Sequence, residues 1–145
     1  MLTAAERSLY DLLVRLSGVE QLGRARIEAA LPPGLTLAQL GVLGLLVKEE
    51  KGSGPLELAR SFGVTKQTMT TTVARLQRSG LVDVCRNPAD GRGKLVTITW
   101  EGAAVQRSCM ERLGPSLAIT ADRMPLDLAD RLGRVLEELE QILAA

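Results

Sequence analysis

The sequence contains no histidine among its 145 residues, two cysteines, and one residue each of Trp, Tyr and Phe. Without histidine, the chain cannot form a Ser-His-Asp or Cys-His catalytic pair, or a zinc site of the usual histidine type. Cys85 and Cys109 are too far apart in sequence for a C-x-x-C motif, which argues against a structural zinc site. We therefore expect a protein that is not an enzyme and that holds neither a metal nor a cofactor.

Long apolar runs are also missing. The longest, from Leu40 to Val47, is far shorter than the roughly 18 residues that a membrane-spanning helix needs. The N-terminus, MLTAAER, lacks the basic segment and apolar run of a signal peptide. Two cysteines without a pairing pattern suit a reducing compartment. These absences predict a cytoplasmic protein.

Neither sign of charge is in clear excess, because 18 Lys and Arg stand against 17 Asp and Glu, a formal net charge of +1. The charge is unevenly distributed, however. From Arg60 to Lys94, seven basic and two acidic residues give a local net charge of +5, which leaves −4 for the rest of the chain. A basic segment in an otherwise acidic chain is typical of a surface that binds nucleic-acid phosphates.

The spacing of apolar residues predicts a mainly helical chain. Apolar residues three and four positions apart predict a helix over residues 3–30, ended by the cluster Pro32-Pro33-Gly34. Thr36, three residues before Gln39, has the spacing of a capping box and predicts a second helix that runs to Glu50. This helix is apolar nearly all round, so it should be buried.

Residues 55–79 predict a helix-turn-helix. A short helix over 55–62 and a turn at Gly63 precede a helix over 66–79, which Thr65 can cap. In this second helix, three apolar residues at positions i, i+4 and i+7 should face the core: Met69, Val73 and Leu76. The opposite face and its N-terminal flank carry small or polar side chains that suit base edges in the major groove: Gln67, Thr71, Ala74, Arg78, Lys66 and Thr70. An ordinary solvated helix face is the alternative interpretation.

A β-hairpin is predicted next. The runs Leu81–Arg86 and Lys94–Trp100 are rich in Val, Ile and Thr, and the second alternates with a period of two. Between them lies a seven-residue loop of turn residues, 87–93. Arg92 and Lys94 project from this loop, and an arginine there can enter a narrow minor groove. Asp90 is placed to hold either the loop or the guanidinium by a charge-assisted hydrogen bond. A plain solvated turn is the alternative.

Two further helices complete the predicted chain. One begins at Thr99 to Gly102 and runs toward residue 120, and Pro115 should kink or break it. The last covers about 125–144 and is long enough to pack against another helix or a second subunit. It carries apolar residues at alternating spacings of four and three: Leu128, Leu132, Val135, Leu139 and Ile142.

In order and in motif, the chain resembles the MarR family of winged-helix regulators. The segment from Leu58 to Thr70 (LARSFGVTKQTMT), followed by Val73, Arg75-Leu76 and Gly80-Leu81-Val82, matches the family's helix-turn-helix. The sequence DGRGK, from Asp90 to Lys94, resembles the family's wing signature D-x-R-x-(K/R). The resemblance covers nearly the whole chain.

The resemblance implies a mainly α fold with a small β-hairpin wing, in which a winged helix-turn-helix domain (35–101) is flanked by helical dimerisation segments (1–34 and 102–145). It implies a homodimeric DNA-binding transcriptional regulator of palindromic operators, more often a repressor than an activator, that responds to a small-molecule effector. Candidate DNA contacts are Thr65, Lys66, Gln67, Thr68, Thr70, Thr71, Arg75, Arg78, Arg92 and Lys94, with Asp90 supporting the wing. Candidate dimerisation residues are Leu9, Leu12, Leu16, Leu128, Leu132, Val135, Leu139 and Ile142.

The sequence departs from the family at one position of the predicted DNA-binding helix, and two alternative functions remain open. The family often has an arginine where this chain has Thr71, so a strong guanine or phosphate contact is missing at that position. The first alternative is a winged-helix module that binds another protein instead of DNA. The second is a cysteine-based redox-responsive regulator, in which oxidation of Cys109 perturbs the dimer. Free cysteines are more often small buried hydrophobes.

Overall fold

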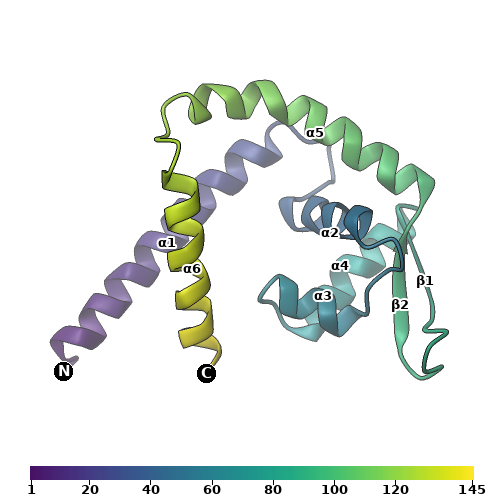
Figure 1. Ribbon diagram of the computed structural model, residues 1–145, viewed down its shortest axis with the longest axis horizontal. Helices are drawn as coiled ribbons and strands as arrows, with labels where there is room; N and C mark the ends of the chain where they lie inside the picture. The colour runs from purple at the N-terminus through teal and green to yellow at the C-terminus, as the bar shows by residue number, and fades with distance from the viewer.

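The computed structural model describes all residues, 1–145. The elements in chain order are α1 (Ala4–Glu28), α2 (Leu37–Lys48), α3 (Pro55–Ser61), α4 (Lys66–Arg78), β1 (Val82–Arg86), β2 (Lys94–Ile98), α5 (Trp100–Ala121) and α6 (Leu128–Ala144). Helices α2, α3 and α4 and the β1–β2 hairpin gather beneath one end of the long helix α5, while α1 and α6 extend from its other end (Figure 1). The predicted mainly α fold with a hairpin wing is confirmed.

Threonine caps fix where several helices begin. Thr36 Oγ1 accepts a hydrogen bond from the Gln39 N–H at 3.2 Å, and the Gln39 side chain accepts one from the Thr36 N–H at 3.0 Å. This capping box satisfies two donors that the first turn of α2 leaves free, as predicted. Thr65 and Thr99 cap α4 and α5 in the same position, each through its side-chain oxygen. Polar caps therefore set the boundaries of the elements on either side of the hairpin.

The main hydrophobic core lies in the region from α2 to β2, which we call the winged region. Helix α2 runs through its centre, as its nearly uniform apolar character predicted. Ten buried residues form this core: Val42, Leu43, Leu46, Leu58, Ala59, Met69, Val73, Leu76, Val82 and Val96. A smaller buried cluster joins the end of α1 and α2 to α5, and it consists of Leu31, Leu40, Cys109 and Leu113. No helix in the chain is both long enough and apolar enough to cross a bilayer.

The antiparallel hairpin pairs Val82 with Ile98 at its base and Arg86 with Lys94 at its tip, which leaves the predicted seven-residue loop. The prediction that its second strand continues to Trp100 is wrong. Thr99 instead caps α5, and Trp100 is the first helical residue, with an exposed side chain. The cap ends the strand because the Thr99 oxygen accepts a hydrogen bond from the Gly102 N–H at 3.0 Å.

The start of α5 is packed tightly against the chain segment that joins α4 to β1. The Thr99 hydroxyl donates to the carbonyl oxygen of Gly80 at 2.7 Å, and the Thr99 N–H donates to that of Leu81 at 3.1 Å. A Cβ atom on Gly102 would lie only 2.0 Å from the Leu81 carbonyl oxygen, so this position requires glycine. The close approach joins α5 firmly to the winged region.

Two further boundaries differ from the sequence prediction. Helix α5 continues through Pro115 to Ala121, so of the predicted kink or break the break does not occur, and the kink stays a prediction. Pro115 has no N–H to donate, so one carbonyl of the preceding turn has no partner within the helix. This stretch of α5 is exposed, so water can hydrogen-bond that carbonyl. Helix α6 begins at Leu128 and not at residue 125, because the residues after Pro125 form a turn in which the Leu128 N–H donates to the Pro125 carbonyl at 3.0 Å.

Candidate nucleic-acid interface

Helix α4 presents one apolar and one polar face. Met69, Val73 and Leu76 are buried in the winged-region core, as their spacing predicted. Lys66 and Thr70, at the N-terminal flank, are exposed to solvent. So are the four predicted outward residues: Gln67, Thr71, Ala74 and Arg78. The helix is thus oriented with its small and polar side chains available to a ligand.

The threonine hydroxyls of α4 already have partners inside the helix. Thr70, Thr71 and Thr72 each donate to the backbone carbonyl four residues earlier, at 2.8, 3.1 and 3.1 Å. At the helix start, the Thr65 oxygen accepts from the Thr68 N–H at 3.1 Å while its hydroxyl donates to the Thr68 oxygen at 2.9 Å. A hydroxyl has a single proton to donate, so most of these side chains offer a ligand only an acceptor oxygen and a methyl group.

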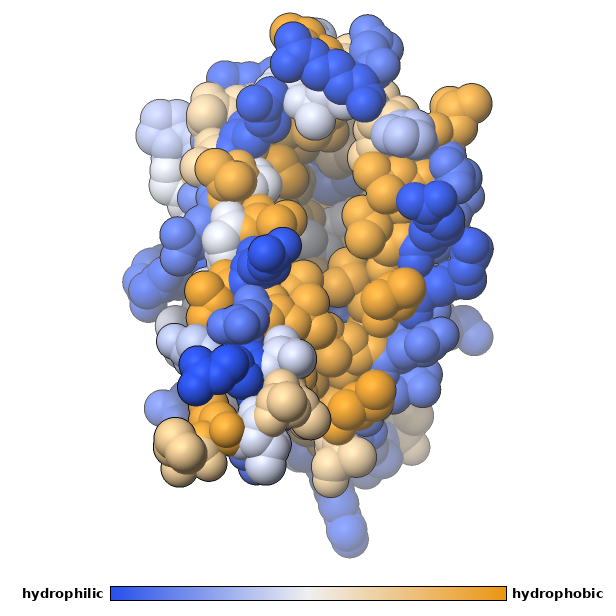
Figure 2. All heavy atoms as spheres, turned by 90° about the vertical axis from the view of Figure 1, so that its left-hand side faces the viewer, coloured by the Kyte–Doolittle hydropathy of each residue, from blue (hydrophilic) through white to orange (hydrophobic).

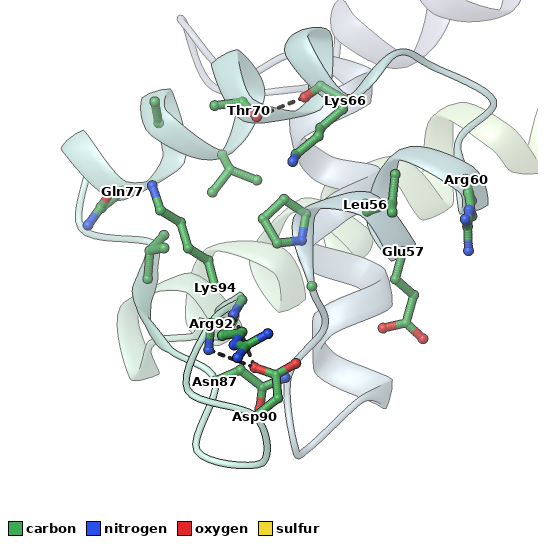
Figure 3. Close-up of a pocket in the computed structure, with 16 residues that line it drawn as sticks. Leu56, Glu57, Arg60, Lys66, Thr70, Gln77, Asn87, Asp90, Arg92 and Lys94 are labelled. Atoms are coloured by element: carbon green, nitrogen blue, oxygen red, sulfur yellow. Dashed lines mark hydrogen bonds between the residues drawn. The ribbon is translucent and has the colours of Figure 1, made fainter.

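The wing loop is shaped by Asp90. One of its carboxylate oxygens accepts hydrogen bonds from the backbone N–H groups of Arg92 and Gly93, both at 3.0 Å (Figure 3). These two bonds hold the pKa of the Asp90 carboxyl below its ordinary value, because they favour the charged form. Of the two predicted roles for Asp90, the structure shows support of the loop backbone. The guanidinium of Arg92 forms no salt bridge and is exposed.

A groove of about 770 Å³ separates α4 from the wing, with α3 forming its third wall (Figure 3). Four basic side chains line it against two acidic ones, and the six are Arg60, Lys66, Arg92, Lys94, Glu57 and Asp90. Helix α4 also contributes Thr70 and Gln77. The predicted contacts Lys66, Thr70, Arg92 and Lys94 therefore meet in one concave, basic surface.

Some residues of this surface were not predicted from the sequence. Pro55, Leu56 and Arg60 come from α3, which the sequence indicates only as the first helix of the helix-turn-helix. Arg60 already counted toward the local positive charge, and this was the available signal. Of the remaining predicted contacts, Arg75 and Arg78 lie on α4 outside the groove, exposed and without an ion pair.

The terminal helices α1 and α6 contain no buried residue, although α6 is strongly amphipathic and α1 carries many exposed apolar side chains. Figure 2 shows their side of the molecule as a hollowed apolar strip between hydrophilic margins. Of the predicted dimerisation residues, Leu16, Leu128 and Leu139 are half-buried, and the others are exposed: Leu9, Leu12, Leu132, Val135 and Ile142. Within a single chain, five of the eight predicted dimerisation side chains are thus exposed, and the other three are only half-buried.

The two cysteines occupy different surroundings. Cys109 is completely buried in the cluster that joins α1, α2 and α5, and this burial raises the pKa of its thiol. Cys85 is exposed on β1. A buried thiol with a raised pKa is a poor target for oxidants, since the thiolate is the reactive form. The surroundings of Cys109 therefore disfavour the redox alternative.

Comparison with known proteins agrees with this architecture. A sequence model of the MarR family matches residues 34–93. The HTH-type transcriptional repressor Rv2887 of Mycobacterium tuberculosis is 31% identical over 137 residues, which cover 94% of this chain and 96% of the relative. The transcriptional activatory protein BadR of Rhodopseudomonas palustris is 33% identical over 103 residues, 70% of this chain but only 57% of BadR.

A solved structure extends the similarity to three dimensions. A cysteine-to-serine mutant of MarR from Escherichia coli, crystallised with operator DNA, has 27% sequence identity and a TM-score of 0.78, covering 91% of this chain and 95% of that one. The likeness includes the long helices as well as the winged region. The chain therefore belongs to the MarR family of winged helix-turn-helix transcriptional regulators.

Proposed function

We propose that this protein is a homodimeric, sequence-specific DNA-binding transcriptional regulator. Helix α4 enters the major groove, and the wing, residues 87–94, reaches the adjacent minor groove. The observation that carries the proposal is the basic groove between α4 and the wing. Its four cationic side chains form no salt bridges, so they are free to neutralise the phosphates of a DNA strand seated between the two elements.

The geometry of the two elements supports this docking. A major groove accepts an α-helix, and the exposed face of α4 carries side chains that can contact base edges. The wing loop is held in shape by Asp90 while the Arg92 side chain stays free, which suits insertion into a narrow, electronegative minor groove. The helix reads bases while the groove and the wing position the protein on the backbone.

The terminal helices support a dimer. Amphipathic helices with no buried residue expose their apolar faces to water unless a second chain covers them. In the proposed division, residues 1–34 and 102–145 form the dimerisation region and residues 35–101 the DNA-binding domain. A two-fold dimer places two copies of α4 against the two halves of a palindromic site.

We propose that the dimer acts in the cytoplasm and regulates transcription by occupying its operator. Among the relatives, Rv2887 is a repressor and BadR an activator, and the longer match favours repression. We propose that the bound dimer blocks access to a promoter and that a small-molecule effector releases it by changing the separation of the two α4 helices. No catalytic role is proposed.

The test is binding of the purified protein to duplexes selected from a random pool, measured over a range of salt concentrations. We expect affinity to fall steeply with salt. Arg92→Ala should weaken binding to most sequences and reduce the salt slope by about one, because one cation fewer neutralises the DNA backbone. Arg131→Ala is the matched control, because Arg131 lies on α6 in an ion pair with Asp127. If the protein binds no duplex in a salt-dependent manner, the proposal is overturned in favour of a protein-interaction module.

A further inference from the structure

The outward face of α4 carries only short side chains at its centre. Along this face lie Gln67, Thr71, Ala74 and Arg78, all exposed. The long side chains that can donate hydrogen bonds stand at the two ends, and the two central residues are short. Contact between this helix and a base pair at its centre is therefore made by a threonine and an alanine.

In the structure, the proton of the Thr71 hydroxyl is directed into its own helix. It donates to the carbonyl oxygen of Gln67 at 3.1 Å, within its own helix. What remains at the centre is the Thr71 methyl group, an oxygen that can accept, and the Ala74 methyl group. With this bond in place, neither residue offers a donor to the O6 and N7 acceptors by which guanine is recognised.

One base pair matches this combination. An A·T pair presents in the major groove the C5 methyl of thymine and, on adenine, an amino group that donates. A C·G pair also offers an amino donor but has no methyl group. We infer that Thr71 and Ala74 select thymine at the centre of each operator half-site through contact with its methyl group, an inference that rests on the proposed function.

The test uses the operator selected from random DNA, in which each thymine of the half-site is replaced in turn by deoxyuridine, which lacks only the C5 methyl. For wild-type protein we expect one or two central positions at which the replacement weakens binding about fourfold, as removal of one buried methyl group predicts. Replacement at the other positions should leave the affinity unchanged.

Two substitutions at one residue separate the methyl from the hydroxyl. Thr71→Val keeps a methyl group and the side-chain shape but loses the acceptor oxygen, so it should keep the preference for thymine over deoxyuridine whatever it loses in overall affinity. Thr71→Ser keeps the hydroxyl and loses the methyl, so it should bind thymine DNA about fourfold more weakly and show no preference at one position. Thr72→Ser is the control, because Thr72 makes the same intrahelical bond on a half-buried flank of α4.

The outcomes are distinct. Wild-type protein that binds its selected operator but tolerates deoxyuridine at every position overturns this inference and leaves the proposed function standing. A loss of binding in Thr71→Val with none in Thr71→Ser also overturns it, in favour of recognition by the hydroxyl. Wild-type protein that binds no member of the DNA pool overturns the proposed function and this inference with it.

Discussion

The winged region and the terminal helices use similar apolar spacing to different ends. Helix α4 has 13 residues and buries the three apolar residues of its periodic face, whereas α1, with 25 residues, and α6, with 17, bury none. The first set of apolar side chains is covered by the same chain, and the second set is left uncovered. A periodic apolar pattern therefore shows that a helix has a face to bury, but not which molecule covers it.

Because one region is covered by its own chain and the other is not, the two regions should respond differently to mutation and to dilution. Stability of the winged region should depend on its own core and be independent of protein concentration. The terminal helices should gain their stability from association, so their order should depend on concentration.

The largest effect is expected in the core of the winged region. Leu43 is completely buried in α2, so Leu43→Ala should lower the free energy of unfolding by about 2–5 kcal/mol. Denaturant titration followed by circular dichroism at two protein concentrations is the measurement. Val47→Ala, on the same helix but exposed, is the control and should cost far less. Equal losses in the two variants would contradict the assigned core.

A charge on the apolar face of α6 should dissociate the dimer without unfolding the winged region. Leu132 is half exposed in the single chain, and a carboxylate there has no partner when a second chain covers it. We expect Leu132→Glu to sediment as a monomer and to bind operator DNA far more weakly. Arg134→Glu places the same charge on an exposed position of α6 and should remain dimeric. A dimeric Leu132→Glu variant would show that α6 lies outside the interface.

At the junction between the two regions, two glycines of α5 should give opposite results. Gly102→Ala forces a methyl group against the Leu81 carbonyl and should destabilise the protein by about 1–3 kcal/mol. Gly114→Ala meets no atom within 4 Å and should stabilise the helix by up to about 1 kcal/mol. Thermal unfolding of both variants is the measurement, and destabilisation by both would mean that α5 is crowded along its whole length.

The two capping boxes provide a matched pair across the comparison. Thr36→Ala removes the cap of the buried helix α2 and should cost about 1 kcal/mol of global stability. Thr3→Ala removes the equivalent cap of α1 but should mainly fray its first turn, since nothing in that turn is buried. Hydrogen exchange can separate global from local loss. A global effect of Thr3→Ala equal to that of Thr36→Ala would contradict the proposed independence of the winged region.

The smallest effect is a local dependence on pH in each region. Hydrogen bonds from backbone N–H groups lower the pKa of Glu6 in the α1 cap and of Asp90 in the wing. Their contribution is fully present above the ordinary carboxyl pKa and is lost as pH falls through the lowered value. NMR titration should show the Arg92 and Gly93 amides losing protection only in that acidic range. Asp90→Asn keeps an acceptor but no titrating group, so these amides should show no such transition.

Much of the fold and part of the site could be predicted because they depend on local chemistry. Thr36 and Thr65 mark helix starts through hydrogen bonds made within three residues, and the turn residues 87–93 mark the wing. The alternation through Trp100 was misleading, because the Thr99 cap outweighed the strand pattern. The break at Pro115 was overestimated, since an exposed helix tolerates the loss of one hydrogen bond.

What could not be predicted depends on rotamers and on distant contacts. Sequence alone does not show that the Thr71 hydroxyl is bonded within its own helix, because threonine adopts more than one rotamer in a helix. It also does not show that α3 forms a wall of the basic groove, since that requires the packing angle between two helices. The burial of Cys109 likewise comes from contacts with α1 and α2, far away in sequence.

The tight junction at Gly102 has a mechanical consequence. The first turn of α5 is held to the segment after α4 through Thr99 and through the close approach to Leu81, so we expect α5 and the winged region to turn together. With 22 residues, α5 is a lever arm roughly 33 Å long. A tilt of about 5° at its far end, among the terminal helices, displaces the winged end by roughly 3 Å, close to the spacing of one base-pair step.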